Sequence, residues 1–145
     1  MCTAEEKTMA RRALIAGSLT GFLAVATGAF GAHALRGTLS ADRMAIYETG
    51  VRYAMYHALA LLMVGVVSLQ FPSPTLRRAG LAFAVGIPLF SGSLWLLALT
   101  DIRWLGAITP FGGLSFLAGW LWLAAGAARA LPTRPDEPPP RNSSG

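Results

Sequence analysis

The sequence predicts an all-α fold, an integral membrane bundle of four transmembrane helices. Apolar residues make up 54% of the 145-residue chain and charged residues only 13%, whereas soluble domains carry about 25% charge. The charges also avoid four long runs, and a helix needs roughly 20 mostly apolar residues to cross the hydrocarbon core. We therefore predict four spans, at about residues 13–32, 53–71, 79–100 and 104–128.

These spans divide the chain into three parts. Residues 1–12 form a short polar N-terminal segment, and residues 13–130 form the four-helix transmembrane domain. Residues 131–145 contain five prolines and no apolar periodicity. Such a composition is typical of a disordered tail, so we expect no packed structure there.

Small residues recur at four-residue spacing along the first span. Gly17 and Gly21 form a GxxxG pair, and Gly28 lies on the same face. Small residues at this spacing let two helices approach closely, so that van der Waals contacts can hold them together. We expect this face to be buried against another span or against a second copy of the chain.

An amphipathic helical segment is predicted between the first and second spans, on the outer face of the membrane. Ser40 can cap a helix that begins at Ala41 and runs through Gly50 into the second span. At about 100° per residue, six polar and aromatic side chains of this helix fall on one half of its surface. They are Glu48, Thr49, Arg52, Tyr53, Tyr56 and His57.

The third and fourth spans contain proline, which removes a backbone hydrogen bond and bends a helix. Pro88 is followed by Gly92, and Pro110 is followed by Gly112 and Gly113. We expect these three glycines, like those of the first span, to be positions where helices pack. Paired broken helices are also typical of transporters, which use such breaks to expose backbone to a substrate.

The distribution of basic residues predicts the orientation. Eight Lys and Arg residues lie in the two terminal segments and the second connection, against four in the first connection and the last turn. Basic residues accumulate on the cytoplasmic side, so both termini are predicted to be cytoplasmic. Although the net charge is +5, the basic residues flank the spans, so nucleic-acid binding is not expected. The lone Cys2 has no partner for a disulfide or a metal site.

Several motifs, taken together, resemble a known family. They are GAFGAHAL (28–35), YHALALL (56–62), FSGSLWLLAL (90–99) and ITPFGGLSFLAGW (108–120). In this order they resemble domain-of-unknown-function family 423, an uncharacterised family of small four-helix membrane proteins with bacterial inner-membrane members. The resemblance covers nearly all of residues 14–128 and implies a four-span membrane protein. It brings no activity, substrate or catalytic residue.

One group of polar residues is a candidate functional cluster, placed at the outer ends of the spans. Its members are His33, Glu48, Arg52, Tyr53, His57, Asp101 and Arg103. The two histidines, with Glu48, could share a haem, a metal or a proton. Alternatively, the charged members clamp the first connection to the last turn. For the histidines we favour a structural role, in which each one hydrogen-bonds to a helix end or a neighbouring span, because no ligand-spacing motif supports a cofactor. For the charged members we favour the clamp, because ion pairs at the span ends cost little.

The function classes that the sequence favours are non-enzymatic. It contains no recognisable catalytic triad, phosphate loop, HExxH or CxxC motif, so no catalytic residue, metal or cofactor is predicted. We expect the protein to act through packing with itself, a membrane-protein partner or membrane lipid. The alternative is a small homo-oligomeric transporter or channel with a polar outer-face site around His33, Glu48, Arg52 and His57.

Overall fold

The computed structural model describes residues 4–130, and this part of the chain consists of helices and short connections without any strand. The predicted all-α class is therefore confirmed. Four helices are long and apolar enough to cross a membrane: Lys7–Leu35, Ala41–Gln70, Pro74–Thr100 and Arg103–Ala130. The tail predicted at 131–145 lies outside the described residues.

The first membrane helix is α1 (Ala4–Phe30), which continues into one π-helical turn, η1 (Gly31–Leu35). It begins upstream of the predicted span 13–32. Residues 4–12 explain this difference, because alanine, glutamate, lysine, methionine and arginine are all strong helix formers. Residues 4–12 therefore extend the first membrane helix toward the N-terminus.

The second membrane helix is α2 (Ala41–Gln70), and it confirms the predicted helical segment between the first two spans. The Ser40 side chain accepts a hydrogen bond from the Arg43 backbone N–H at 3.4 Å, as an N-cap residue does. The helix then runs through Gly50 without a break. The prolines that follow, Pro72 and Pro74, prevent it from continuing.

The third membrane helix has three parts: α3 (Pro74–Ile87), a π-helical turn η2 (Pro88–Gly92), and α4 (Ser93–Thr100). The π turn begins at the proline, whose ring removes one backbone donor. The Ser93 hydroxyl lies 2.6 Å from the Leu89 carbonyl and 2.9 Å from the Phe90 carbonyl. It therefore compensates for the disturbed backbone bonding, as a nearby hydroxyl can.

The fourth membrane helix begins with a 3-10 turn, η3 (Arg103–Ala107), and continues as α5 (Thr109–Ala130). Pro110 lies in the first turn of α5. Backbone N–H groups in a first turn have no partner within the helix, so the N–H that proline lacks costs no helical hydrogen bond. Before η3, Asp101 adopts a left-handed conformation with φ of 60°, which turns the chain sharply after α4.

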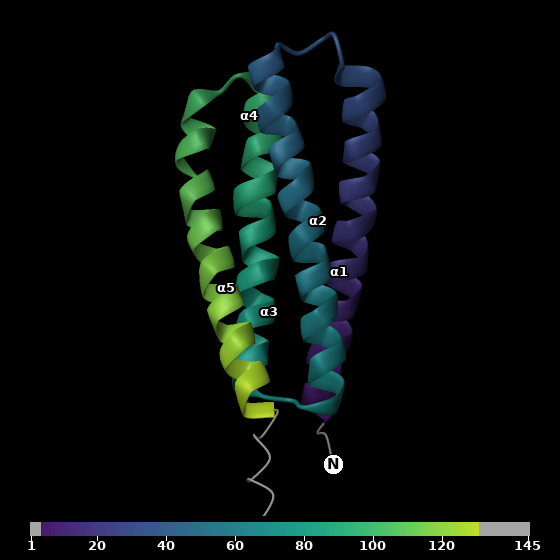
Figure 1. Ribbon diagram of the computed structural model, residues 1–145, viewed down its shortest axis with the longest axis vertical. Helices are drawn as coiled ribbons and strands as arrows, with labels where there is room; N and C mark the ends of the chain where they lie inside the picture. Colours follow the sequence, from purple (N-terminus) through teal and green to yellow (C-terminus); the bar gives the residue numbers. More distant parts are fainter. Residues whose placement is uncertain (1–3, 131–145) are drawn as a thin grey trace, which may run out of the picture.

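The helices form two antiparallel pairs that meet through α2 (Figure 1). α1 packs on α2, α3 packs on α5, and α2 also contacts α3 and α4. A core cluster joins α2, α3 and α5, and contains Leu61, Val64, Leu76, Phe83 and Phe116. α1 lies at one edge of the bundle and buries little of its surface in the chain.

The two ends of the described chain lie at the same end of the bundle (Figure 1). We call this the terminal end, where α1 begins and α5 ends. The opposite end carries the connection 36–40 and the turn at 101–102. Many side chains on the flanks are large, apolar and exposed, including Leu19, Phe22, Val25, Leu117 and Leu121, which suits surfaces in contact with lipid tails.

Three of the predicted packing glycines lie in close contact with a neighbouring helix. A Cβ atom added at Gly17 would lie 2.9 Å from the Ala58 carbonyl oxygen, and one at Gly28 would lie 3.2 Å from Val51. A Cβ at Gly112 would lie 2.5 Å from the Phe90 backbone nitrogen. At Gly17 and Gly112 the neighbouring backbone is so close that a larger side chain would push the helices apart, and at Gly28 the Val51 side chain would have to shift.

The other predicted packing glycines behave differently. At Gly21 and Gly113 an added Cβ would meet its nearest neighbour at 3.9 and 3.8 Å, an ordinary contact distance. At Gly92 it would meet nothing within 4 Å. Gly92 lies in the π turn, where an added Cβ would find open space, so its predicted packing role stays a prediction. Glycines that the prediction missed, and at which an added Cβ would lie less than 3.0 Å from a neighbour, are Gly31, Gly50, Gly65, Gly86, Gly119 and Gly126.

Candidate functional site

The predicted polar cluster is not assembled as one site. His33, Glu48, Arg52, Asp101 and Arg103 are all exposed at or near the opposite end. Arg52 donates a hydrogen bond to the Thr49 hydroxyl at 3.2 Å, within its own helix. Within residues 4–130, no ion pair joins any two of these residues.

Two members of the cluster, Glu48 and Arg52, do line the same small pocket. Its volume is about 180 Å³, and it lies between α1, η1 and α2 with Arg36 at its edge. Neither histidine contributes to its lining. Across the described chain, no three His, Cys, Asp or Glu side chains lie close enough together to hold a metal ion.

A clamp between the two helix pairs does exist, but Arg43 makes it. Its Nε atom donates a hydrogen bond to the Ala98 carbonyl oxygen at 2.7 Å, linking α2 to α4. Ala98 lies in the last turn of α4, where carbonyl groups have no helical partner and accept outside donors. The predicted clamp of Glu48, Arg52, Asp101 and Arg103 is therefore corrected.

Tyr47 makes a second bond at this end. Its hydroxyl donates to the Thr27 carbonyl oxygen at 2.8 Å, and its ring lies against Gly31. Only 2% of its surface is exposed. Tyr47 thus joins α2 to α1 from the turn of α2 that follows Arg43.

His57 lies in the middle of α2, contrary to its predicted place at the outer end of the span. It is about 24 Å along a helix of roughly 45 Å, at 1.5 Å per residue, and only 4% of its surface is exposed. The difference arises because α2 begins at Ala41, so residues 41–52 form part of the membrane helix.

Both ring nitrogens of His57 are engaged. Nδ1 lies 2.8 Å from the Tyr53 carbonyl oxygen, which can only accept, so Nδ1 carries the proton. Nε2 then accepts a hydrogen bond from Trp120 Nε1 of α5 at 3.2 Å. These two bonds fix the neutral ring in one tautomer.

Aromatic rings surround this imidazole. The Phe116 ring stacks on it, with ring centroids 3.4 Å apart and planes 5° from parallel. Phe83 and Tyr53 lie at 5.6 and 6.0 Å. Tyr53 in turn stacks on Phe90 at 4.6 Å. His57 therefore serves as the polar centre of an aromatic cluster between α2, α3 and α5.

Further hydrogen bonds join α5 to the third membrane helix. Ser93 and Thr109 share one at 2.9 Å, and the Ser115 hydroxyl donates to the Ala82 carbonyl at 2.8 Å. At the terminal end, Arg129 donates to the Thr75 hydroxyl at 2.8 Å. Two buried polar atoms, the Ser91 hydroxyl oxygen and Trp95 Nε1, have no hydrogen-bond partner within the described residues.

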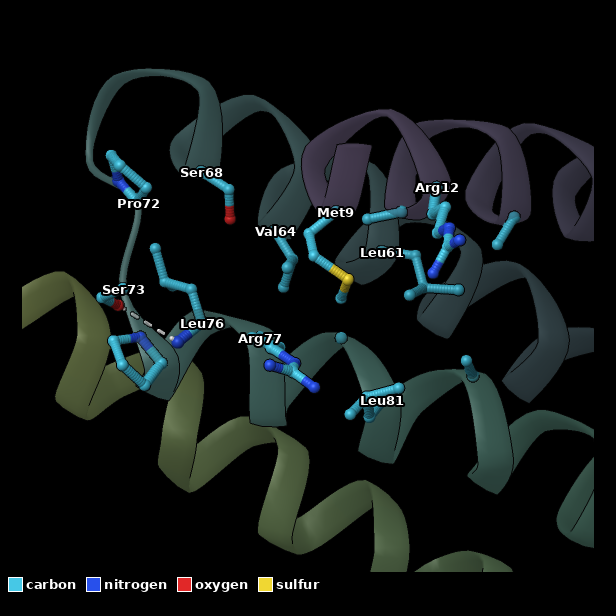
Figure 2. Close-up of a pocket in the computed structure, with 15 residues that line it drawn as sticks. Met9, Arg12, Leu61, Val64, Ser68, Pro72, Ser73, Leu76, Arg77 and Leu81 are labelled. Carbon is cyan, nitrogen blue, oxygen red and sulfur yellow. Dashed lines mark hydrogen bonds between the residues drawn. The ribbon is translucent and has the colours of Figure 1, made fainter. Parts of the chain in front are cut away.

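A larger cavity lies at the terminal end, between α1, α2 and α3 (Figure 2). Its volume is about 460 Å³. Leu61 and Val64 of α2 line it, together with residues 9–16 of α1, residues 72–73 of the connection, and residues 74–84 of α3. We call this cavity the groove. It exists because α1 packs on α2 with only slight contact to α3.

The groove combines apolar walls with two cations. Ala13 and Ala16 of α1 face it, as do Leu81 and Ala84 of α3. Arg12 of α1 and Arg77 of α3 also line it, and both are exposed. The Ser73 hydroxyl at one end is used to cap α3, by accepting from the Leu76 backbone N–H at 3.2 Å (Figure 2).

Sequence reasoning did not predict the groove, because its lining comes from three helices whose relative rotation the sequence does not give. Two signals were present. Met9, Arg12, Ala13 and Ala16 are spaced as one face of a helix. The pair Arg77 and Arg78 also follows a proline-containing turn.

Four apolar helices, held together inside by polar and aromatic contacts, define a small four-span integral membrane protein. A family model described as "Protein of unknown function (DUF423)" matches residues 27–113. The chain belongs to this family, which confirms the resemblance seen in its motifs.

Its relatives have membrane-protein names. A UPF0382 membrane protein of Staphylococcus haemolyticus is 52% identical over 110 residues, covering 76% of this chain and 89% of the relative. The UPF0382 inner membrane protein YgdD of Escherichia coli K12 is 43% identical over 116 residues, covering 80% and 88%. YwdK of Bacillus subtilis, also a UPF0382 membrane protein, is 41% identical over 119 residues, covering 81% and 97%. No solved structure matches the chain.

Proposed function

We propose that the protein is a non-enzymatic lipid-binding bundle of the bacterial inner membrane. One observation carries this proposal: the groove is the larger of the two cavities described above, and its walls are mainly apolar. Its lining on the third membrane helix spans residues 74–84, about 15 Å at 1.5 Å per residue. Half the hydrocarbon core is about 15 Å thick. The groove is therefore long enough to hold an acyl chain through one leaflet.

The interior polar groups support binding rather than chemistry or transport. His57, Ser93, Ser115 and Arg129 each bond to another helix. These hydrogen bonds hold the helices together. They also pair polar groups that would be costly to leave without a partner in a membrane interior. His33, Glu48, Arg52 and His57 are not brought together, so nothing in the arrangement favours the transporter alternative.

The proposed orientation places both termini in the cytoplasm. The first and last described residues both lie at the terminal end of the bundle (Figure 1). The Lys and Arg count of eight against four favours the cytoplasmic side for this end. The groove would then lie in the cytoplasmic leaflet.

Native mass spectrometry of the protein, released gently from its own membrane, tests this function. We expect the chain mass plus the mass of one phospholipid. Ala84→Phe places a bulky ring in the groove and should lower the lipid-bound fraction, whereas Ala124→Phe, at an exposed site of α5 outside the groove, should not. The bare chain, or an added mass matching haem, metal or a second polypeptide, would contradict the proposal. Multiples of the chain mass in the same spectrum would report self-association, the other mode of action that the sequence favours.

A further inference from the structure

We infer that the small pocket at the opposite end binds the headgroup of a phospholipid that carries a primary ammonium group, with Arg52 on the phosphate and Glu48 on the ammonium. The pocket lies between α1, η1 and α2, so this second lipid site is separate from the groove and can be tested separately. Its volume, about 180 Å³, is below the roughly 300–1,000 Å³ of pockets that enclose a whole drug-sized ligand. It therefore suits a headgroup, with the rest of the lipid outside.

Glu48 and Arg52 lie at a depth where charged side chains are unusual. The Tyr47 ring lies against Gly31, which places this turn of α2 level with the last part of the charge-free run 13–32 of α1. Glu48 follows Tyr47 directly, and Arg52 lies one turn deeper in the bundle. Ionisable residues at membrane depth are costly and typically mark a site for a ligand or an ion.

Both side chains are able to bind a ligand. Within residues 4–130 the Glu48 carboxylate forms no ion pair and accepts no hydrogen bond, although Arg52 lies one turn away on the same helix. Arg52 donates one hydrogen bond, to the Thr49 hydroxyl at 3.2 Å, and a guanidinium carries several more N–H donors. The carboxylate and most of the guanidinium are therefore free to pair with charges of opposite sign.

The two residues begin an exposed stripe on α2 that has the order of groups in a phospholipid. From the opposite end toward the middle of the bundle, at spacings of three or four residues, the stripe contains Glu48, Arg52, Tyr56, Leu59 and Met63. The last three are large and more than half exposed, at 55%, 56% and 53%. A lipid of this leaflet has its acyl chains deepest, then its phosphate, and its ammonium attached beyond the phosphate. An acyl chain on the three deeper side chains would thus bring the phosphate to Arg52 and the ammonium to Glu48.

The acid in this pocket determines which headgroup fits. A primary ammonium has N–H groups that donate charge-assisted hydrogen bonds to a carboxylate. The quaternary ammonium of a choline headgroup has no N–H, and a glycerol headgroup has no positive charge. A wholly anionic headgroup would also be repelled by Glu48, so the pocket discriminates against it.

The remaining charges at this end do not alter the pattern. Arg36, from the connection after η1, is the third charged residue of the lining, so two arginines and one glutamate give the pocket a net charge of +1. This excess adds to the attraction for a phosphate. The ionisable residues at this end that do not line the pocket are His33, Asp42, Arg43, Asp101 and Arg103. Two acids among them offset two arginines, and Arg43 is bonded to the Ala98 carbonyl.

Lipid titration of the full-length, delipidated protein tests the inference, with native mass spectrometry as the readout. Phosphatidylethanolamine, phosphatidylcholine and phosphatidylglycerol with identical acyl chains are compared. An exposed ion pair changes an affinity by up to roughly fivefold, so we expect phosphatidylethanolamine to bind about two- to fivefold more tightly than either of the others. Glu48→Gln should abolish this preference, because a neutral amide does not attract the ammonium. Arg52→Gln should weaken all three lipids by a similar factor, because each of them has a phosphate.

Matched variants control for charge and for folding. Asp42→Asn removes a negative charge from the same helix outside the pocket, and Arg103→Gln removes a positive charge at the same end. Both should keep the preference. Glu48→Asp retains the carboxylate and should keep part of it, while gel filtration and circular dichroism confirm that each variant folds. Lipid bound in the groove is common to all these variants, so a difference between them reports the pocket.

The outcomes separate this site from the groove. Equal affinities of the unmodified protein for the three lipids would overturn the inference and leave lipid binding in the groove standing. A preference that survives Glu48→Gln, or that Asp42→Asn abolishes equally, would also overturn it. Displacement of phosphatidylethanolamine by millimolar phosphoethanolamine would show a site for a soluble zwitterion and would overturn a lipid as the occupant. Failure to retain any lipid would overturn both proposals.

Discussion

Trp120 of α5 donates a hydrogen bond through Nε1 to Nε2 of His57, across 3.2 Å in the middle of the bundle. The other ring nitrogen of His57 bonds to the Tyr53 carbonyl of its own helix. The imidazole is thus oriented by its own helix and bonded to another, and its ring lies flat against Phe116.

Loss of this bond should weaken the bundle measurably. Hydrogen bonds between membrane helices contribute about 0.6 kcal/mol on average and up to about 1.7. We expect Trp120→Phe to lower the free energy of unfolding in detergent by about 0.5–2 kcal/mol. Trp122→Phe is the control, because Trp122 lies on the same helix, is 37% exposed and makes no described hydrogen bond. Equal losses in both variants would show that the bond to His57 contributes nothing.

The bond between Arg43 and the Ala98 carbonyl predicts a second difference in stability. Hydrogen bonds to charged groups contribute about 1.5–3 kcal/mol. Arg43→Met should therefore lower the free energy of unfolding by about 1–3 kcal/mol, since it removes the link between α2 and α4. Arg52→Met should have an effect below about 0.5 kcal/mol, because Arg52 bonds only within its own helix. A thermal unfolding series would contradict this account if Arg52 proved the more important of the two.

The glycines give a third test, with opposite signs at two nearby sites. Gly112→Ala would bring a Cβ to 2.5 Å from the Phe90 backbone nitrogen, so the variant should be destabilised by about 1–3 kcal/mol. Gly92→Ala meets nothing within 4 Å and has helical φ and ψ angles of −63° and −44°. It should be neutral or more stable by up to about 1 kcal/mol, because alanine favours helix over glycine. Destabilisation of Gly92→Ala by as much as Gly112→Ala would contradict the contacts described here.

The proposed orientation predicts which cysteines can be labelled from outside the cell. In a Cys2→Ser background, Thr38→Cys at the opposite end should react with a membrane-impermeant maleimide in intact cells. Arg78→Cys at the terminal end should react only after the membrane is opened. The reverse pattern would place both termini outside and remove the groove from the cytoplasmic leaflet.

The sequence was sufficient to predict the four membrane helices and the start of the second. Long runs without charge are a direct requirement of the hydrocarbon core, so they are informative without any knowledge of packing. The Ser40 cap is equally local, because its acceptor and its donor lie three residues apart. Local chemistry of this kind can be recognised in one segment of the chain.

Contacts between helices could not be predicted in the same way. Arg43 bonds to a backbone carbonyl, and since every residue has one, no pairing motif marks it in the sequence. The tight approach of Gly86 to Phe116 and of Gly119 to Phe83 depends on how α3 and α5 are rotated against each other. The groove depends on the same kind of information for three helices, which is why its two arginines were attributed only to orientation.

Site-specific photocrosslinking tests the central claim, that lipid occupies the groove, most directly. A photoreactive amino acid is placed at Leu81, which lines the groove, or at Val85, which is equally exposed on α3 but lies outside it. The protein is then transferred into detergent before illumination, which removes freely exchanging lipid. We predict a covalent lipid adduct at position 81 and little at position 85. No adduct at 81, or equal adducts at both positions, would contradict the claim.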